Sequence, residues 1–359
     1  MQTLLDEKSK TFKSDVEIFT HDFLSKPINL KNLWQSLYKK GFISSDSSFL
    51  NDVLLTQAVC KVNPGIGLFL LTQFACINIF KNHANNKLKE KYLNKLISGE
   101  YIACFSITEP NAGSDVTMIE TTAKKEGEDY IINGHKIWAS NASISDVIIL
   151  FAQLKEYKDK SGITCFLIPS NAVSIKKNTP KLGVQVSPSN EIFIKDLKIP
   201  AENQIGETGD GIKIALSAIT IGRIYCAAQA VGLLEGILNE SVKHAVKRNQ
   251  FGKRIIDNQA VAWYVADMTK DLDGAKLLLY KAVWAKENKS NELNKLSSMT
   301  KYFSTEYAQK HSVKAVQIFG GSGLNEDSYV AQAYRDSKVL EIYEGTNEIQ
   351  KVIIARELF

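Results

Sequence analysis

The distribution of proline along the chain constrains the fold more than any other sequence feature. All seven prolines lie at or before Pro200, and the last 159 of the 359 residues contain none. Because proline breaks helices, a long proline-free segment is free to form long helices. Apolar residues also recur in this segment at helical spacing, in Ile212, Leu216, Ile219, Leu233, Leu234, Ile237 and Leu238. The segment is therefore predicted to form a helical bundle.

Two other patterns precede the bundle. Residues 1 to about 100 are predicted to be helical, with helices at 29–39, 52–60 and 87–97, the last ended by Gly99. The apolar stretch 66–80 is too short to span a membrane and is predicted to be a buried helix. Short β-prone runs follow, at residues 101–107, 130–132, 136–138, 147–151, 163–168 and 191–194. Two turn signals separate them, a predicted hairpin at Asn133-Gly134 and a turn at Ser161-Gly162.

Composition narrows the function class only a little. The net charge of +5 is small for this length and spread along the sequence, so no nucleic-acid surface is predicted. The five cysteines lie among apolar neighbours without a Cys-x-x-Cys pair, which predicts buried, reduced thiols in a cytoplasmic protein. The five histidines show no ligand spacing, so no metal site is predicted. The polar, acidic start does not resemble a signal peptide, and no membrane association is expected.

One carboxylate near the end of the chain stands out. Glu344 lies between Tyr343 and Gly345, with apolar residues before it and a helical pattern after Thr346. A carboxylate held partly out of water at such a junction would have a raised pKa and could act as a general base. The alternative is a solvated acid at a helix start, stabilised by the helix dipole.

Two segments of the β region also suggest a binding site. Residues 108–115 (Thr-Glu-Pro-Asn-Ala-Gly-Ser-Asp) form a loop of small and hydroxyl residues that could grip a flat polar ring or a phosphate. An ordinary Pro/Gly turn is the alternative. Residues 133–140 lead into a strand with a single tryptophan, Trp138, which could contact a ligand or belong to the core.

Three further short motifs follow these segments in chain order: residues 248–252 (Arg-Asn-Gln-Phe-Gly), 317–321 (Gln-Ile-Phe-Gly-Gly) and 334–336 (Tyr-Arg-Asp). Together with 108–115, 133–138 and 343–346, they resemble the ordered motifs of the acyl-CoA dehydrogenase family of flavoproteins. The resemblance runs from about Lys87 to Phe359. It implies an α+β fold that is mainly α with a β domain. The expected parts are an N-terminal helical domain (1–100), a middle β-barrel domain (101–203) and a C-terminal four-helix bundle (204–359).

The resemblance also implies an FAD site. Residues that would line the flavin ring are Phe105, Ile107, Thr108, Gly113, Ser114, Trp138 and Ser140. Thr346 and Glu348 would lie near the phosphate and ribityl region of the same subunit's cofactor. Arg248, Phe251, Gln317 and Gly321 resemble residues that a neighbouring subunit offers to the diphosphate and adenine. A shared site of this kind implies a homo-oligomer, and the family is usually a tetramer.

The implied reaction is α,β-dehydrogenation of an acyl thioester. Glu344 would remove the α-proton while a β-hydride passes to flavin N5, and the backbone N–H of Glu344 would help to polarise the thioester carbonyl. Ser114, Arg223, Tyr343 and Gly345 would contact the substrate. Some family members place the base immediately before the arginine that matches Arg223. This chain has Gly222 there, so Glu344 is the expected base. A structural ion pair remains the alternative role for Arg223.

Several positions depart from the family pattern. An early Leu-Pro-x-x-Tyr-Gly-Gly segment is missing, Thr220 replaces an acid, Gln185 replaces an arginine, and Phe105 replaces a tyrosine. These changes suggest an alternative substrate, an acyl or aminoacyl group carried on a carrier protein instead of CoA. Electrons would leave to an electron-transfer flavoprotein or to oxygen. A non-catalytic scaffold with a flavin fold is a further alternative. Leu70, Phe74 and Ile79 are candidates for setting the depth of the acyl pocket.

Overall fold

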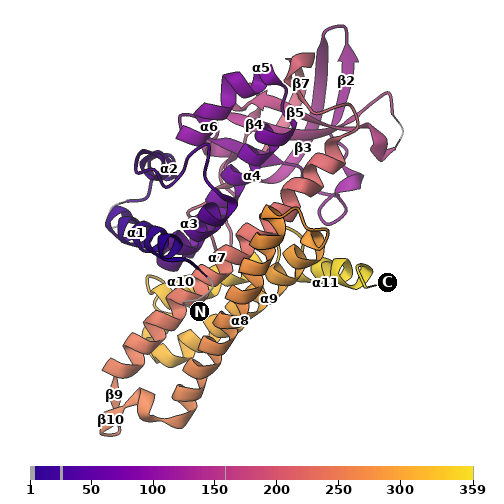
Figure 1. Cartoon of the computed structure of the whole chain (residues 1–359). Helices are drawn as coiled ribbons and strands as arrows, with labels where there is room; N and C mark the ends of the chain where they lie inside the picture. The colour runs from indigo at the N-terminus through magenta and orange to yellow at the C-terminus, as the bar shows by residue number, and fades with distance from the viewer. Residues whose placement is uncertain (1–4, 25–26, 158, 359) are drawn as a thin grey trace.

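Three segments of different secondary structure follow one another in the predicted order (Figure 1). A computed structural model of the chain describes residues 5–24, 27–157 and 159–358. Helices come first, a β domain follows, and helices form the rest of the chain, with α7 (Gly211–Lys247) running past both other parts. The predicted α+β fold class, mainly α with a β domain, is confirmed.

The N-terminal segment is helical as predicted. Its helices are α1 (Glu7–Leu24), α2 (Leu30–Lys39), α3 (Phe49–Val62), α4 (Gly67–His83), α5 (Asn86–Leu88) and α6 (Asn94–Ser98), with a π-helical turn (Lys89–Leu93) between the last two. Gly99 ends α6 with a φ of +78°, a conformation that favours glycine.

Among the described residues, two helical runs are long and apolar enough to cross a membrane by length and composition alone, Pro64–His83 and Gly211–Lys247. The first is longer than the predicted 66–80. Within the fold, however, 89% and 78% of their most apolar windows are buried. Packing inside the protein therefore accounts for their apolar character.

The β domain contains strands β1 (Ala103–Ser106), β2 (Thr122–Glu126), β3 (Asp129–Ser140), β4 (Val147–Leu154), β5 (Ile163–Pro169), β6 (Ser174–Ile175), β7 (Ser189–Pro200) and β8 (Gln204–Ile205). Their order is β6-β7-β3-β1-β4-β5-β8. Strand β2 also pairs with both β3 and β4, so β1, β3, β2 and β4 close a ring. This closure places a separate apolar core inside the β domain, built around Ile132, Leu150 and Phe166.

The hairpin predicted at Asn133-Gly134 is wrong. The pair lies inside β3, where the register against β7 shifts between Ile132 and Gly134. The chain turns earlier, at Gly127, whose φ is +62°. Gly134 is required for packing, because a Cβ there would lie 2.2 Å from Thr121 Oγ1. The sequence signal therefore marks a β-bulge that re-aims the second half of β3.

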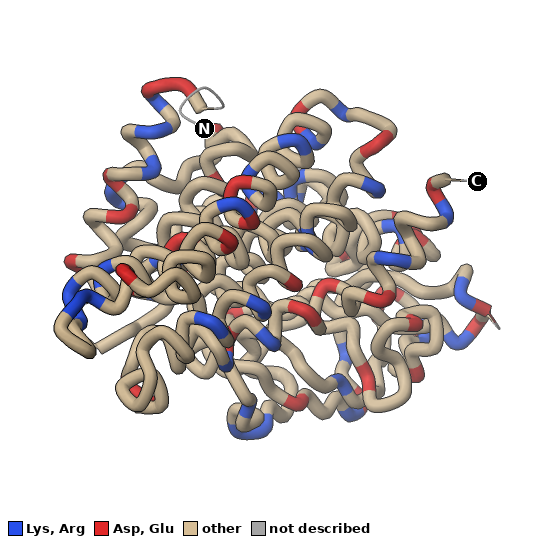
Figure 2. Tube along the Cα trace, turned by 90° about the horizontal axis from the view of Figure 1, so that it is seen from below, with Lys and Arg blue, Asp and Glu red and all other residues tan. Residues whose placement is uncertain are grey.

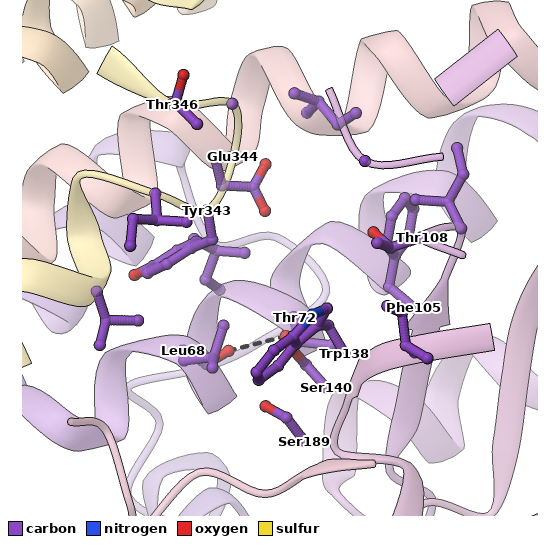
Figure 3. Close-up of a pocket in the computed structure, with 18 of the residues that line it drawn as sticks. Leu68, Thr72, Phe105, Thr108, Trp138, Ser140, Ser189, Tyr343, Glu344 and Thr346 are labelled. Atoms are coloured by element: carbon purple, nitrogen blue, oxygen red, sulfur yellow. Dashed lines mark hydrogen bonds between the residues drawn. The ribbon is translucent and has the colours of Figure 1, made fainter. Parts of the chain in front are cut away.

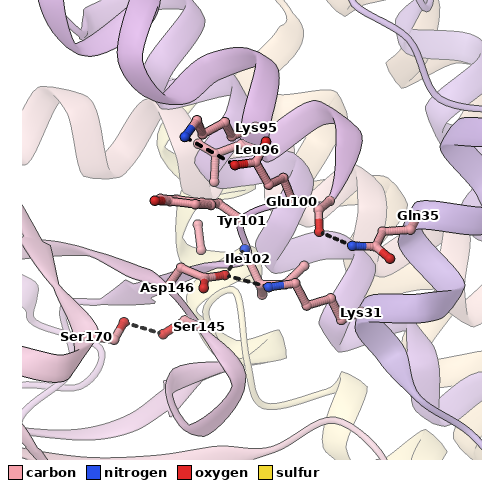
Figure 4. Close-up of polar contacts among 12 residues, drawn as sticks. Lys31, Gln35, Lys95, Leu96, Glu100, Tyr101, Ile102, Ser145, Asp146 and Ser170 are labelled. Carbon is pink, nitrogen blue, oxygen red and sulfur yellow. Dashed lines mark hydrogen bonds and ion pairs between the residues drawn. The ribbon is translucent and has the colours of Figure 1, made fainter.

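A small polar cluster joins the N-terminal helices to the start of β1 (Figure 4). The Asp146 carboxylate accepts a hydrogen bond from the backbone N–H of Ile102 at 2.8 Å and pairs with Lys31 Nζ at 3.1 Å. Gln35 Nε2 of α2 donates to the carbonyl of Gly99 at 3.0 Å. These contacts fix the point at which the chain passes from helix into the sheet.

The C-terminal segment is the predicted bundle. Helices α7, α8 (Gln259–Glu287) and α9 (Leu293–Phe319) pack along one another, and α10 (Tyr329–Leu340) and α11 (Asn347–Arg356) pack on α9. The buried face of α9 carries small hydroxyl residues, including Ser297, Ser304 and Ser312. Small side chains let α7 and α9 approach closely. A short hairpin, β9 (Asn249–Gln250) and β10 (Lys253–Arg254), joins α7 to α8.

Acidic and basic residues are interspersed along the trace in Figure 2, in keeping with the small net charge. All five cysteines are buried and free, as predicted.

Candidate active site

A cavity of about 660 Å³ lies where the β domain, α4, α7 and the turn after α10 meet. Helix α4 contributes Leu68, Leu71, Thr72 and Ala75, and α7 contributes Ala218 and Ile219. Leu70, Phe74 and Ile79 do not line the cavity. The prediction that they set its depth is therefore wrong. Phe74 instead packs against Trp34 and stacks on Tyr225 at 5.1 Å in the core.

Eleven of the predicted site residues line this cavity. Seven come from the β domain and its loops: Phe105, Ile107, Thr108, Gly113, Ser114, Trp138 and Ser140. The other four form the turn between α10 and α11: Tyr343, Glu344, Gly345 and Thr346. Residues more than 200 positions apart in sequence therefore face one another across one space (Figure 3).

Glu344 occupies the centre of the turn. Its φ is +58°, unusual for a residue with a side chain, and Gly345 follows with +83°. Thr346 then caps α11 by accepting a hydrogen bond from the backbone N–H of Ile349. The two left-handed residues reverse the chain, and the Glu344 carboxylate points into the cavity toward the wall that carries Thr108 and Phe105 (Figure 3).

Burial raises the pKa of Glu344 to about 7 from its ordinary value of 4.5. Two cations oppose the effect of burial on this pKa, Arg223 and then Lys301. A carboxylate with a pKa near neutrality is matched to proton abstraction at physiological pH. The alternative, a solvated acid at a helix start, is therefore wrong, because burial would not raise the pKa of a solvated carboxylate.

Gly222 of α7 leaves the space that the Glu344 carboxylate occupies. A Cβ on residue 222 would lie 2.3 Å from Glu344 Oε2 and 2.6 Å from its Cδ. Any side chain here would compete with the carboxylate for the same volume. The neighbouring Arg223 is buried, and its Nη1 donates to Asn294 Oδ1 at 3.1 Å. Arg223 does not line the cavity, so it acts on Glu344 through charge.

Trp138 forms part of the opposite wall. It lies in a second register shift of β3, between Lys136 and Ala139, with a φ of +55°. Its side chain is 53% exposed, although it lines the cavity. An indole that presents its surface to a cavity and not to the core can stack on a flat ligand. Of the two readings of Trp138, the structure supports ligand contact.

A buried ion pair supports the loop 108–115 from behind. Lys136 Nζ is fully buried, contacts Glu109 Oε1 at 2.7 Å and donates to the carbonyl of Ile107 at 3.0 Å. Glu109 Oε1 also accepts a hydrogen bond from the backbone N–H of Thr121 at 3.0 Å. Both residues lie within the motifs noted in the sequence, but neither was predicted as functional.

Comparison with known proteins agrees with this architecture. The acyl-CoA dehydrogenase middle domain matches residues 104–197, and the acyl-CoA dehydrogenase C-terminal domain matches residues 209–359. The chain belongs to the acyl-CoA dehydrogenase family. It is 35% identical over 325 residues to a short-chain-specific acyl-CoA dehydrogenase of Clostridium acetobutylicum, covering 90% of this chain and 86% of the relative.

Solved structures of this family superpose on nearly the whole chain. The butyryl-CoA dehydrogenase of Megasphaera elsdenii has a TM-score of 0.92 and 30% identity, covering 99% of this chain and 98% of that one. The prolyl acyl carrier protein oxidase AnaB has a TM-score of 0.94 and 29% identity, covering 99% of both chains. The similarity therefore extends to relatives described for CoA thioesters and to one described for a carrier protein.

Four residues predicted from the acyl-CoA dehydrogenase motifs lie away from the cavity. Arg248 and Phe251 lie at the β9–β10 hairpin, and Phe251 is 99% exposed. Gln317 and Gly321 lie near the same end of α7. Phe319, which lies between them in sequence, stacks on His244 of α7 with 4.2 Å between the ring centroids. This cluster occupies the end of the bundle far from the β domain (Figure 1). Within the described part of the chain, these residues cannot complete the cavity of their own subunit.

Glu348 is also displaced from the main cavity. It lines a smaller adjoining cavity of about 250 Å³, together with Lys338 and Lys351. Thr346 borders both cavities. The two predicted phosphate-side residues therefore lie close together at the start of α11, but only Thr346 reaches the main cavity.

Proposed function

We propose that the protein catalyses FAD-dependent α,β-dehydrogenation of an acyl thioester, with Glu344 as the base that removes the α-proton. The observation that carries the proposal is the placement of the Glu344 carboxylate, which projects into an apolar cavity with its pKa near 7. It faces a wall of aromatic and hydroxyl side chains that suits a flavin. Membership of the acyl-CoA dehydrogenase family supports this assignment.

The residues around the cavity fit an FAD ring. The exposed indole of Trp138 offers a stacking surface, and Thr108 and Ser140 offer hydroxyl groups beside it. A bound FAD would supply a hydride acceptor opposite Glu344. Phe105, Ile107, Gly113 and Ser114 would complete the wall around the ring.

The chain's own groups would handle the proton. The Glu344 carboxylate accepts the α-proton, and burial favours the resulting neutral carboxyl group. No acceptor for the Glu344 backbone N–H occurs among the described residues, so this donor is free to bind the thioester oxygen. Tyr343 and Gly345 flank the base and would border the acyl group.

The rate of this step should depend on pH through Glu344. The base works only when ionised, so kcat/KM for flavin reduction is expected to rise with pH and to level off above a midpoint near 7. Stopped-flow measurement without oxygen, from pH 5.5 to 9, would give this profile. A profile that falls through pH 7 would contradict the assignment of Glu344 as the base.

Arg248, Phe251, Gln317 and Gly321 support a homo-oligomeric site, and we propose a tetramer. In each chain these four residues would contact the FAD of a neighbouring subunit, where Arg248 would contact phosphate oxygens. Arg248→Glu should therefore lower the FAD content, although the residue lies outside its own cavity. Co-expression of the Arg248→Glu and Glu344→Gln chains, each inactive alone, should restore part of the activity, since mixed oligomers contain complete sites. No recovery in verified mixed oligomers would contradict a shared site.

The direct test of function is reduction of bound flavin by substrate. Purified holoprotein would be mixed without air with a series of acyl-CoAs, and loss of the oxidised flavin absorbance would be followed. Bleaching by one acyl-CoA supports the proposed reaction and identifies the chain length. Protein that binds no FAD, even when FAD is supplied, would contradict the proposal. The electron acceptor would be identified by comparing the rates at which an electron-transfer flavoprotein and oxygen reoxidise the reduced flavin of the wild-type protein.

A carrier-bound acyl or aminoacyl substrate is a second candidate. The similarity to AnaB, described as a prolyl acyl carrier protein oxidase, favours it. Gln185 replaces the family arginine in the loop whose residues Lys181 and Leu182 line the cavity. The group that carries the acyl chain could therefore differ from CoA. Bleaching by a carrier-bound thioester, with no bleaching by the same acyl group on CoA, would favour this candidate.

A further inference from the structure

A buried lysine of α9 contacts the turn that carries Glu344. Lys301 is fully buried, and its ammonium donates to the carbonyl of Glu341 at 3.0 Å, the carbonyl of Gly345 at 2.9 Å and Asn347 Oδ1 at 2.9 Å. An ammonium has three protons, and all three are directed at one turn. A buried ammonium needs such partners, because an unpaired one would be strongly destabilising.

The turn needs this support because its backbone is strained. Glu344 has a left-handed φ of +58°, which is unfavourable for a residue with a Cβ. Lys301 is thus one clamp on this turn, and Gln350 is a second. Gln350 Nε2 donates to the carbonyl of Glu344 at 3.1 Å and to that of Gly345 at 2.8 Å. The Gly345 carbonyl therefore accepts from both clamps. Lys301 and Gln350 differ in one respect, since only the lysine carries a charge.

The charge of Lys301 acts on the Glu344 carboxylate. Arg223 from α7 and Lys301 from α9 are the cations that oppose the effect of burial on the pKa of Glu344. Glu341 lies nearby, but its carboxylate pairs with Lys338 at 2.6 Å. The nearby Cys226 thiol has a pKa raised to about 12 by burial, so it stays neutral. The charged groups that act on the Glu344 carboxylate are therefore positive on balance.

We propose that Lys301 is a positioning residue of the site, which fixes the backbone of the turn that carries Glu344 and supplies one of two buried positive charges that keep this carboxylate available as a base. The inference rests on the proposed function for its catalytic meaning. That Lys301 holds this turn and acts on the Glu344 carboxylate by its charge does not depend on turnover.

The test is the titration of the Glu344 carboxyl group in the FAD-loaded protein. Infrared difference spectra across pH would follow the protonated carboxyl band, with Glu344→Gln identifying the band. In Lys301→Met the midpoint is expected to move up by about one pH unit or more, since a nearby opposite charge is lost. Lys301→Gln, which keeps hydrogen-bond donors without charge, should show the same shift and serves if the Met variant does not fold.

Gln350→Met is the matched control. It removes a clamp from the same Gly345 carbonyl but removes no charge, so flavin reduction should slow while the carboxyl midpoint stays at its wild-type value. An unchanged midpoint in Lys301→Gln, or an equal upward shift in Gln350→Met, would overturn the inference. If Glu344→Gln reduced flavin as fast as wild type, the proposed function would fail while the Lys301 shift could still be observed.

Discussion

Glu344→Gln is expected to slow flavin reduction by an acyl thioester by about 10²- to 10⁴-fold, the usual contribution of a general base. Glutamine keeps the size and the hydrogen-bonding capacity of the side chain but cannot accept the α-proton. The visible spectrum of bound flavin and the FAD content should match wild type, because the carboxylate is not expected to hold the cofactor. Stopped-flow rates at pH 8 would measure the loss.

The same substitution should stabilise the fold at high pH. The folded-state pKa of Glu344, about 7, lies above its ordinary value of 4.5, so the native protein holds this proton more tightly than the unfolded chain. Stability from this group is therefore complete below about pH 4.5 and is lost as pH rises through 7. At pH 8, Glu344→Gln should raise the free energy of unfolding by an amount on the order of 1–3 kcal/mol. A variant that is inactive and also less stable at pH 8 would indicate damage to the fold instead of loss of a base.

Gly222→Ala should lower the rate of flavin reduction by about 10²-fold, because a displacement of about 1 Å is enough to misplace a catalytic group. The added Cβ would lie 2.3 Å from Glu344 Oε2, and the carboxylate is the part free to move. Alanine also favours a helix over glycine by about 1 kcal/mol, so the free energy of unfolding should not fall. Activity and stability are thus expected to separate.

Gly274→Ala in α8 is the control for this experiment. Its Cβ would meet only the ring edge of Phe303, at 3.2 Å, and the residue does not line the cavity. The control should share the helix-propensity gain and keep wild-type rates. Full activity in Gly222→Ala would mean that the Glu344 carboxylate does not work from the position seen in the structure.

The large parts of the fold could be predicted from the sequence because they depend on local pattern. A proline-free segment with helical spacing became α7, α8 and α9, and the β-prone runs became strands of one domain. Asn133-Gly134 does not form a hairpin because it is paired on both sides inside β3, Asn133 with Thr122 of β2 and Gly134 with Ile194 of β7. Turn propensity alone cannot distinguish a bulge inside a strand from a turn between strands.

The site was predictable where function is carried by contiguous motifs. Glu344 and Trp138 were identified in this way, and the structure brings them to one cavity. Lys301 lies among Ser297, Ser298 and Ser304 with no motif around it, so nothing in the sequence distinguishes it from a surface lysine. Its role depends on which carbonyl groups α9 meets, and this information exists only in the folded chain.

The central claim is that Glu344 takes the α-proton while a β-hydride leaves. The most direct measurement is the rate of anaerobic flavin reduction by the best thioester substrate, prepared with deuterium at the α-carbon, at the β-carbon, or at neither. The account predicts that each deuterated substrate reduces the wild-type flavin several-fold more slowly, and that Glu344→Gln reduces it hardly at all. Equal rates for the α-deuterated and unlabelled substrates, with full activity in Glu344→Gln, would contradict it.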